Sequence, residues 1–83
     1  MADKPVLKVR IIDPNQVLFD GTADFVFAPT SKGMLGILPS HTPLFAELTP
    51  GTLELHGQQS TEFLIEAGII RVHNDGVTIL IGL

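Results

Sequence analysis

Hydrophobic and polar residues alternate with a period of two along most of this chain. In the first run, Leu7, Val9 and Ile11 alternate with Lys8 and Arg10. Successive side chains of a β-strand point to opposite faces, so this spacing predicts a strand with one buried and one solvent-facing side. Later runs repeat the same period and none shows a sustained helical one, so the sequence predicts an all-β protein.

Turn-forming residues divide the chain into many short strands. They occur in the runs 13–15, 30–33, 56–59 and 74–76, and Pro29 is expected to end the strand before the second of these. Short strands in such number must bury two apolar faces against each other, which predicts a two-sheet β-sandwich. A small β-barrel is the alternative architecture.

Some apolar residues do not fit the predicted core faces. In the third run Ala23, Phe25 and Phe27 share one face of the predicted strand, and Val26 and Ala28 share the other face. The residues that lie out of phase with the core are Ile12, Leu18, Val26, Leu64, Ile69 and Leu80. Because 45% of this short chain is hydrophobic, we expect some of them to lie on an interface.

Length and composition indicate one small domain. The 83 residues suit a single unit, 1–83, in which 1–4 form a loosely ordered tail. The chain has no cysteine, and its start does not resemble a secretion signal, so we expect a cytosol-facing protein. Its apolar runs are far shorter than the ~18 residues that span a bilayer, so direct membrane insertion is not expected.

The charge pattern argues against two classes of ligand. The formal net charge is −4, and the five basic residues are dispersed along the sequence. Nucleic acid and anionic lipid both require concentrated positive charge. We therefore expect neither as a direct partner.

No pattern for catalysis or metal binding stands out. Ser40 and His41 are adjacent, so in an extended segment their side chains point apart instead of forming a nucleophilic pair. His41, His56 and His73 lack the spacing of metal ligands and are interpreted as solvated histidines, two of them beside turns. The pair Gly33 and Gly36 lacks the remainder of a phosphate-binding loop. The sequence predicts no catalytic residue, metal or cofactor.

The most specific motif is the run 33–44, Gly-Met-Leu-Gly-Ile-Leu-Pro-Ser-His-Thr-Pro-Leu, followed by Leu-Thr-Pro-Gly-Thr-Leu at 48–53. Glycines and prolines at fixed offsets restrict the backbone and keep hydrogen-bond donors out of the sheet. We interpret a set of these residues and one later glycine as structural: Gly33, Gly36, Pro39, Pro43, Gly51 and Gly68.

This motif resembles the signature of the epsilon subunit of rotary F-type ATP synthases. The segments 17–21 and 67–72 are also similar to that family, so the resemblance covers nearly the whole chain. It implies a sandwich of about ten short strands and a non-catalytic central-stalk subunit that couples the gamma subunit to the membrane c-ring. It also implies a position on the cytoplasmic side of an energy-transducing membrane.

The resemblance also implies contact residues. Met34, Ser40 and His41 match the part of the family that faces the polar loops of the c-ring. Thr42, Phe45 and Ala46 are candidates for the contact with gamma. Many relatives have an acidic residue at the position of Met34, so here the contact would depend on packing and on hydrogen bonds.

The end of the chain departs from the family pattern. Relatives commonly continue into a helical hairpin that regulates the enzyme, whereas this chain ends with Ile-Leu-Ile-Gly-Leu at 79–83. The sequence therefore lacks the segment that forms the regulatory hairpin, either because the natural subunit is short or because the sequence is one part of a longer protein. The alternative function is a free-standing β-sandwich module that binds a small ligand or a peptide, and a small enzyme is a more remote third possibility.

Overall fold

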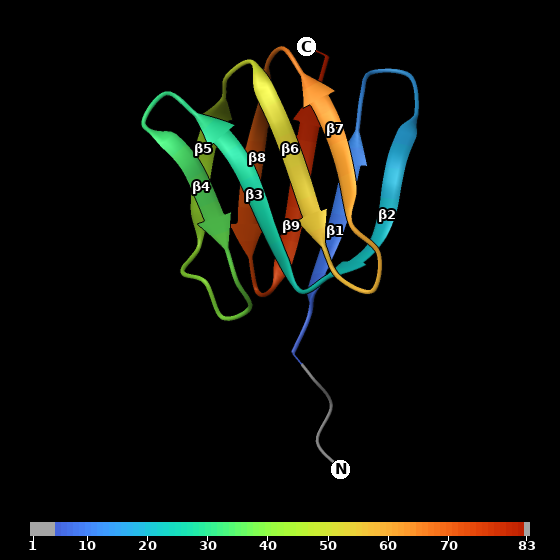
Figure 1. Cartoon of the computed structure of the whole chain (residues 1–83), viewed down its shortest axis with the longest axis vertical. Helices are drawn as coiled ribbons and strands as arrows, with labels where there is room; N and C mark the ends of the chain where they lie inside the picture. Colours follow the sequence, from blue (N-terminus) through green and yellow to red (C-terminus); the bar gives the residue numbers. More distant parts are fainter. Residues whose placement is uncertain (1–4, 83) are drawn as a thin grey trace.

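The computed structural model describes residues 5–82, and within them it contains nine β-strands in two sheets (Figure 1). The expected loose tail at 1–4 lies outside the described residues. The strands are β1 (Leu7–Ile12), β2 (Val17–Ala23), β3 (Phe25–Thr30), β4 (Gly33–Ile37), β5 (Leu44–Leu48), β6 (Gly51–His56), β7 (Thr61–Ile65), β8 (Gly68–His73) and β9 (Gly76–Ile81).

The two sheets pack face to face as a sandwich. One sheet has five strands in the order β2-β1-β9-β8-β5, and the other has four in the order β4-β3-β6-β7. The pair β1 and β9 is parallel, and the other paired strands are antiparallel. The predicted sandwich is confirmed, and the alternative of a closed barrel is wrong. Residues 5–82 form nine strands, one fewer than the ten that were expected. No helix long and apolar enough to cross a membrane occurs among residues 5–82.

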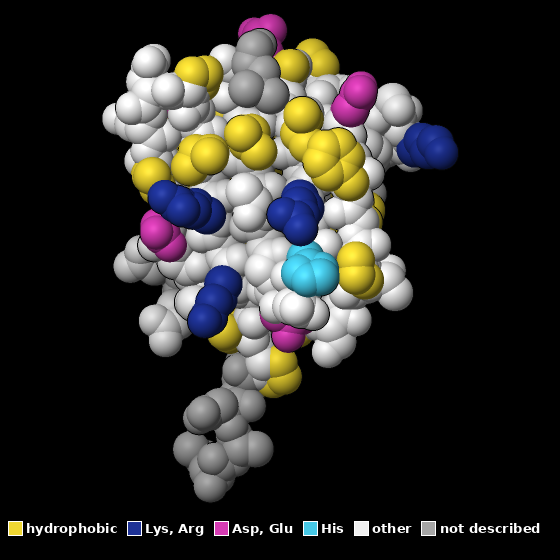
Figure 2. Space-filling model, turned by 180° about the vertical axis from the view of Figure 1, so that it is seen from behind, with side chains coloured by type: hydrophobic (Ala, Val, Ile, Leu, Met, Phe, Trp, Pro, Cys, Tyr) yellow, Lys and Arg dark blue, Asp and Glu magenta, His cyan; other side chains and the backbone are white. Residues whose placement is uncertain are grey.

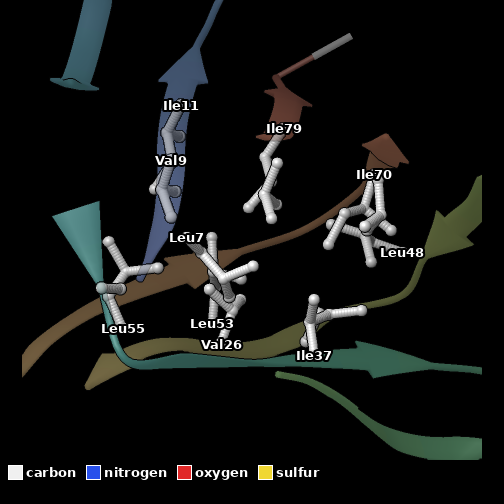
Figure 3. Close-up of a cluster of buried hydrophobic side chains, with 14 of the residues drawn as sticks. Leu7, Val9, Ile11, Val26, Ile37, Leu48, Leu53, Leu55, Ile70 and Ile79 are labelled. Atoms are coloured by element: carbon white, nitrogen blue, oxygen red, sulfur yellow. The ribbon is translucent and has the colours of Figure 1, made fainter. Parts of the chain in front are cut away.

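The core lies between the sheets and follows the predicted alternation on most strands. Leu7, Val9 and Ile11 are at most 1% exposed, and Figure 3 shows side chains from both sheets that meet in this layer. The later runs also contribute as predicted, since Ile70 and Val77 are buried. The buried residues are Leu7, Val9, Ile11, Ala23, Val26, Ala28, Ile37, Leu48, Leu53, Leu55, Ile65, Ile70, Val72, Val77 and Ile79.

The predicted phase of the third run was wrong. Val26 and Ala28 are fully buried, while Phe27 is 37% exposed on the outer face. The reason is the bend at Asp24, which separates β2 in one sheet from β3 in the other. The alternation restarts there, so the buried Ala23 does not set the phase of β3.

Pro29 does not end β3, which continues to Thr30. Pro29 pairs with Met34 of β4, but the ladder between β3 and β6 covers only 25–27 on β3. The missing amide of Pro29 therefore falls beyond that ladder, where it costs no strand hydrogen bond to β6. Gly51 makes room for this ring, because a Cβ on Gly51 would lie 2.9 Å from the Pro29 Cβ.

Candidate partner-binding surfaces

All six predicted contact residues lie on β4, on β5, or on the connection 38–43 between them. These two strands are edges of different sheets and lie on the same side of the sandwich (Figure 1). A shallow groove of about 410 Å³ runs between them, and Met34, Leu44 and Ala46 are among the residues that line it. The groove therefore joins one candidate for the c-ring contact with one for the gamma contact.

Met34 lies near the start of β4 and is 54% exposed. Gly33, just before it, has a φ of 107°, which a residue with a side chain adopts only with strain. Ser40 and His41 lie beyond the other end of β4, and three residue steps from Met34 to Ile37 already span roughly 10 Å. The structure does not bring Met34 together with Ser40 and His41.

The connection 38–43 is a compact turn that contains both motif prolines, Pro39 and Pro43. The His41 amide donates to the Leu38 carbonyl at 3.1 Å. The ring nitrogen Nδ1 of His41 donates to the Thr42 carbonyl oxygen at 2.6 Å. Since a carbonyl only accepts, Nδ1 carries the proton, and Nε2 is the acceptor of the neutral ring.

The gamma-contact candidates point in different directions. Thr42 is exposed in the connection, and Phe45 is 68% exposed on the outer face of β5. Ala46, the next residue, turns to the opposite face and packs against the core. Phe45 and Thr42 therefore offer accessible surface, whereas Ala46 contributes to the wall of the groove.

The outer face of the five-stranded sheet carries an apolar row that the sequence indicated only in part. Ile12 pairs with Leu80, and Leu80 pairs with Ile69, so these side chains cross three neighbouring strands at one level. Phe45 extends this surface on β5, where it pairs with Arg71. Figure 2 shows this face, with hydrophobic side chains gathered over the part nearer the C-terminal end of β1. The out-of-phase positions Ile12, Ile69 and Leu80 were thus predicted, but their alignment required the strand order.

Positively charged side chains also lie on this face. Lys8 and Arg10 alternate outward on β1, and Arg71 points outward from β8 (Figure 2). These residues are dispersed in the sequence, and the strand order β1-β9-β8 brings them to one face. Asp20 pairs with Arg10 across the β1–β2 ladder and lowers the local positive charge.

His56 is not the solvated turn histidine that the sequence indicated. Its ring stacks on Phe25 with centroids 4.6 Å apart and planes 11° apart. Its Nε2 lies 2.8 Å from a carboxylate oxygen of Glu54, two residues earlier on the same face of β6. His73 is exposed, as expected for a residue beside a turn. Across residues 5–82, no group of three His, Cys, Asp or Glu residues is arranged to hold a metal ion.

These features define a small β-sandwich that presents apolar surface and hydrogen-bonding groups on its strands and on one connection. Residues 6–82 match the family model described as ATP synthase, Delta/Epsilon chain, beta-sandwich domain. The chain belongs to this family.

Relatives with known names agree with this assignment. The chain is 40% identical over 77 residues to the ATP synthase epsilon chain of Herminiimonas arsenicoxydans, covering 89% of this chain and 55% of the relative. It is 39% identical over 75 residues to that of Acidithiobacillus ferridurans, covering 89% of this chain and 53% of the relative. The chain thus spans about half the length of these relatives.

Solved structures share the fold. A chain in the cryo-EM structure of the Euglena gracilis mitochondrial ATP synthase, OSCP/F1/c-ring, matches with a TM-score of 0.86 and 19% identity, over 96% of this chain and 53% of that one. A chain in the Tetrahymena thermophila mitochondrial ATP synthase central stalk and c-ring matches with a TM-score of 0.77 and 21% identity, over 96% of this chain and 66% of that one.

Proposed function

We propose that this chain is a non-catalytic, epsilon-type subunit of the central stalk of an F-type ATP synthase. The observation that carries the proposal is the family match over residues 6–82, joined to relatives that are named epsilon chains. The similar folds in a c-ring complex and in a central stalk support the same role. In this role the chain couples the gamma subunit to the c-ring on the cytoplasmic side of the membrane.

The gamma subunit packs on the outer face of the five-stranded sheet and on its edge strand β5. Phe45 is 68% exposed there, and the apolar row Ile12, Ile69 and Leu80 continues the surface inward. Aromatic and aliphatic side chains held on strands bind with little loss of side-chain freedom. Thr42 adds a hydroxyl at the rim of this contact, and Ala46 supports it from the groove.

The c-ring contact uses Met34, Ser40 and His41. Met34 offers a flexible, uncharged side chain that adapts to an apolar surface. The Nε2 of His41 and the hydroxyl of Ser40 supply hydrogen bonds, each worth only about 0.5–1.5 kcal/mol net between neutral groups. A contact built this way depends on many small contributions, so its geometry must be held firmly.

A rigid sandwich suits the transmission of torque. The contact residues lie on hydrogen-bonded strands or on one short connection, and the core beneath them is closely packed. Surfaces held by packed strands deform less under load than those on long loops. The two partners can therefore be linked without a mobile joint in this chain.

Site-specific cross-linking in the assembled complex tests the contacts. The chain has no native cysteine, so Met34→Cys, His41→Cys and Phe45→Cys each introduce a single thiol. We expect the first two to cross-link to the c-ring and the third to gamma. Leu64→Cys on β7, where the residue is 87% exposed, is the matched control and should cross-link to neither.

Met34 and His41 lie at opposite ends of β4. The Met34→Cys and His41→Cys variants therefore test two separate parts of the proposed ring contact. Cross-linking of only one of them to the c-ring would restrict the ring contact to that end of the strand. Yields equal to those of the Leu64 control at both positions would refute the ring contact altogether.

A further inference from the structure

Asp75 connects the turn between β8 and β9 to the connection that carries Ser40 and His41. Its carboxylate oxygen Oδ1 accepts a hydrogen bond from the Ser40 backbone amide at 2.7 Å, although 35 positions separate the two residues in sequence. Figure 1 shows both segments at the same end of the sandwich. A hydrogen bond to an ionised acceptor is stronger than one between neutral groups.

Ser40 occupies a backbone conformation that depends on such support. Its φ is 67°, in the left-handed region that residues other than Gly, Asn and Asp rarely adopt. The bond to Asp75 fixes the amide of this residue, and the following amide, that of His41, donates to the Leu38 carbonyl. The conformation of Ser40 thus sets the direction in which the chain leaves toward His41.

Asp75 itself is held in place. Asn74 and Asp75 have φ values of 49° and 59°, which fit the two-residue turn of a tight hairpin. The Lys8 amide at the start of β1 donates to the Asp75 carbonyl at 2.8 Å. The backbone of Asp75 is therefore anchored to the sheet while its carboxylate reaches the connection.

We propose that Asp75 is a positioning residue that holds the 38–43 connection in its partner-binding shape through the Ser40 amide. The inference rests on the proposed function for the identity of the partner, the c-ring. The effect on the connection itself is a property of the isolated chain and can be measured there.

Two substitutions of Asp75 distinguish an effect of its carboxylate from an effect on the turn, and a third changes Ser40. Asp75→Gly removes the acceptor but tolerates positive φ, and Asn-Gly is the dipeptide that such turns prefer, so the hairpin is retained. Asp75→Asn also tolerates positive φ and keeps a carbonyl oxygen in place of Oδ1. Ser40→Gly removes the need for support, because glycine adopts this φ without strain.

The readouts are amide hydrogen exchange and the intraresidue HN–Hα NOE of Ser40 in the isolated chain, together with affinity for detergent-solubilised c-ring. We expect Asp75→Gly to accelerate exchange of the Ser40 amide by about tenfold, to weaken its NOE, and to lower ring affinity by about fivefold or more, since a charge-assisted hydrogen bond is lost. Asp75→Asn should have a smaller effect than Asp75→Gly on all three readouts, because it retains an acceptor but loses the charge. Ser40→Gly also removes the hydroxyl assigned to the ring contact, so the comparison is made within that background: adding Asp75→Gly to Ser40→Gly should lower ring affinity by no more than about a further twofold, because glycine at position 40 no longer needs the support.

Unchanged exchange and NOE at Ser40 in Asp75→Gly would overturn the proposal, and so would a changed connection with unaltered ring affinity. If the connection responds as expected but the parent chain itself binds no ring, the positioning of Ser40 by Asp75 stands and the proposed ring contact fails.

Discussion

Gly68 on β8 lies so close to Leu80 on β9 that a Cβ at this position would be 2.5 Å from the Leu80 carbonyl oxygen. Gly68 pairs with Ile81 in the antiparallel ladder between β8 and β9, and with Leu48 in the ladder between β8 and β5. Only glycine permits this approach of the two backbones. Gly68, which the sequence indicated as a structural glycine, thus has a steric reason to be there.

Gly68→Ala should destabilise the fold, because the added methyl group displaces backbone and not a flexible side chain. We expect a loss of roughly 1–3 kcal/mol in the free energy of unfolding, typical of overpacking. The matched control is Gly57→Ala, whose Cβ would lie an ordinary 3.5 Å from the nearest atom, the Ala23 Cα. Equal midpoints of urea unfolding for the two variants would contradict the steric account.

Two leucines test the assignment of the core. Leu53 on β6 is fully buried, whereas Leu64 on β7 is 87% exposed. We expect Leu53→Ala to cost about 2–5 kcal/mol through lost burial and the cavity left behind. Leu64→Ala should change the free energy of unfolding by less than about 0.5 kcal/mol, as for most surface substitutions. Denaturant unfolding of both variants measures the difference, and comparable losses would mean that the two strand faces are wrongly assigned.

The stacked ring of His56 should contribute to stability, unlike that of His73. His56→Ala removes the stack on Phe25 and the bond to Glu54, so we expect a loss of about 0.5–1.5 kcal/mol. His73→Ala removes an exposed ring and should be nearly neutral. Thermal unfolding of the two variants in parallel compares them directly. An unaffected midpoint in His56→Ala would show that the stack contributes nothing to the fold.

The apolar row on the five-stranded sheet should be needed for gamma binding. Ile69→Glu places a charge at the β8 end of this row, next to Leu80, so we expect at least about a tenfold loss of affinity for gamma from desolvating that charge. Leu64→Glu puts the same charge on β7 of the other sheet and should leave affinity unchanged. Titration of gamma with each variant, after circular dichroism has shown that both are folded, gives the comparison. Equal affinities would remove this face from the proposed interface.

Much of the fold could be predicted from the sequence because a strand's two faces differ so clearly in polarity. The alternation in β1 identified Leu7, Val9 and Ile11 as core residues, and the run 74–76 marked the last hairpin. The error in β3 arose where the chain passes from one sheet to the other at Asp24. A period of two cannot show that its phase restarts at a bend.

The candidate site was harder to predict, since it depends on which strands become neighbours. Local sequence cannot show that β1 pairs with β9 and thereby aligns Ile12 with Leu80. Nor can it show that Asp75 reaches Ser40 from 35 positions away. His56 was misread for the same reason, because its partner Phe25 lies on a different strand. Contacts of this kind follow from the topology and not from spacing along the chain.

The proposed rotor role requires this chain to bind gamma. Its most direct test is co-purification of the 83-residue chain with the gamma subunit of the same organism, with the mass of the complex measured by light scattering. We predict a stable complex with one copy of each protein. Elution of the two proteins as separate species would contradict this role and would favour a free-standing sandwich that binds another ligand.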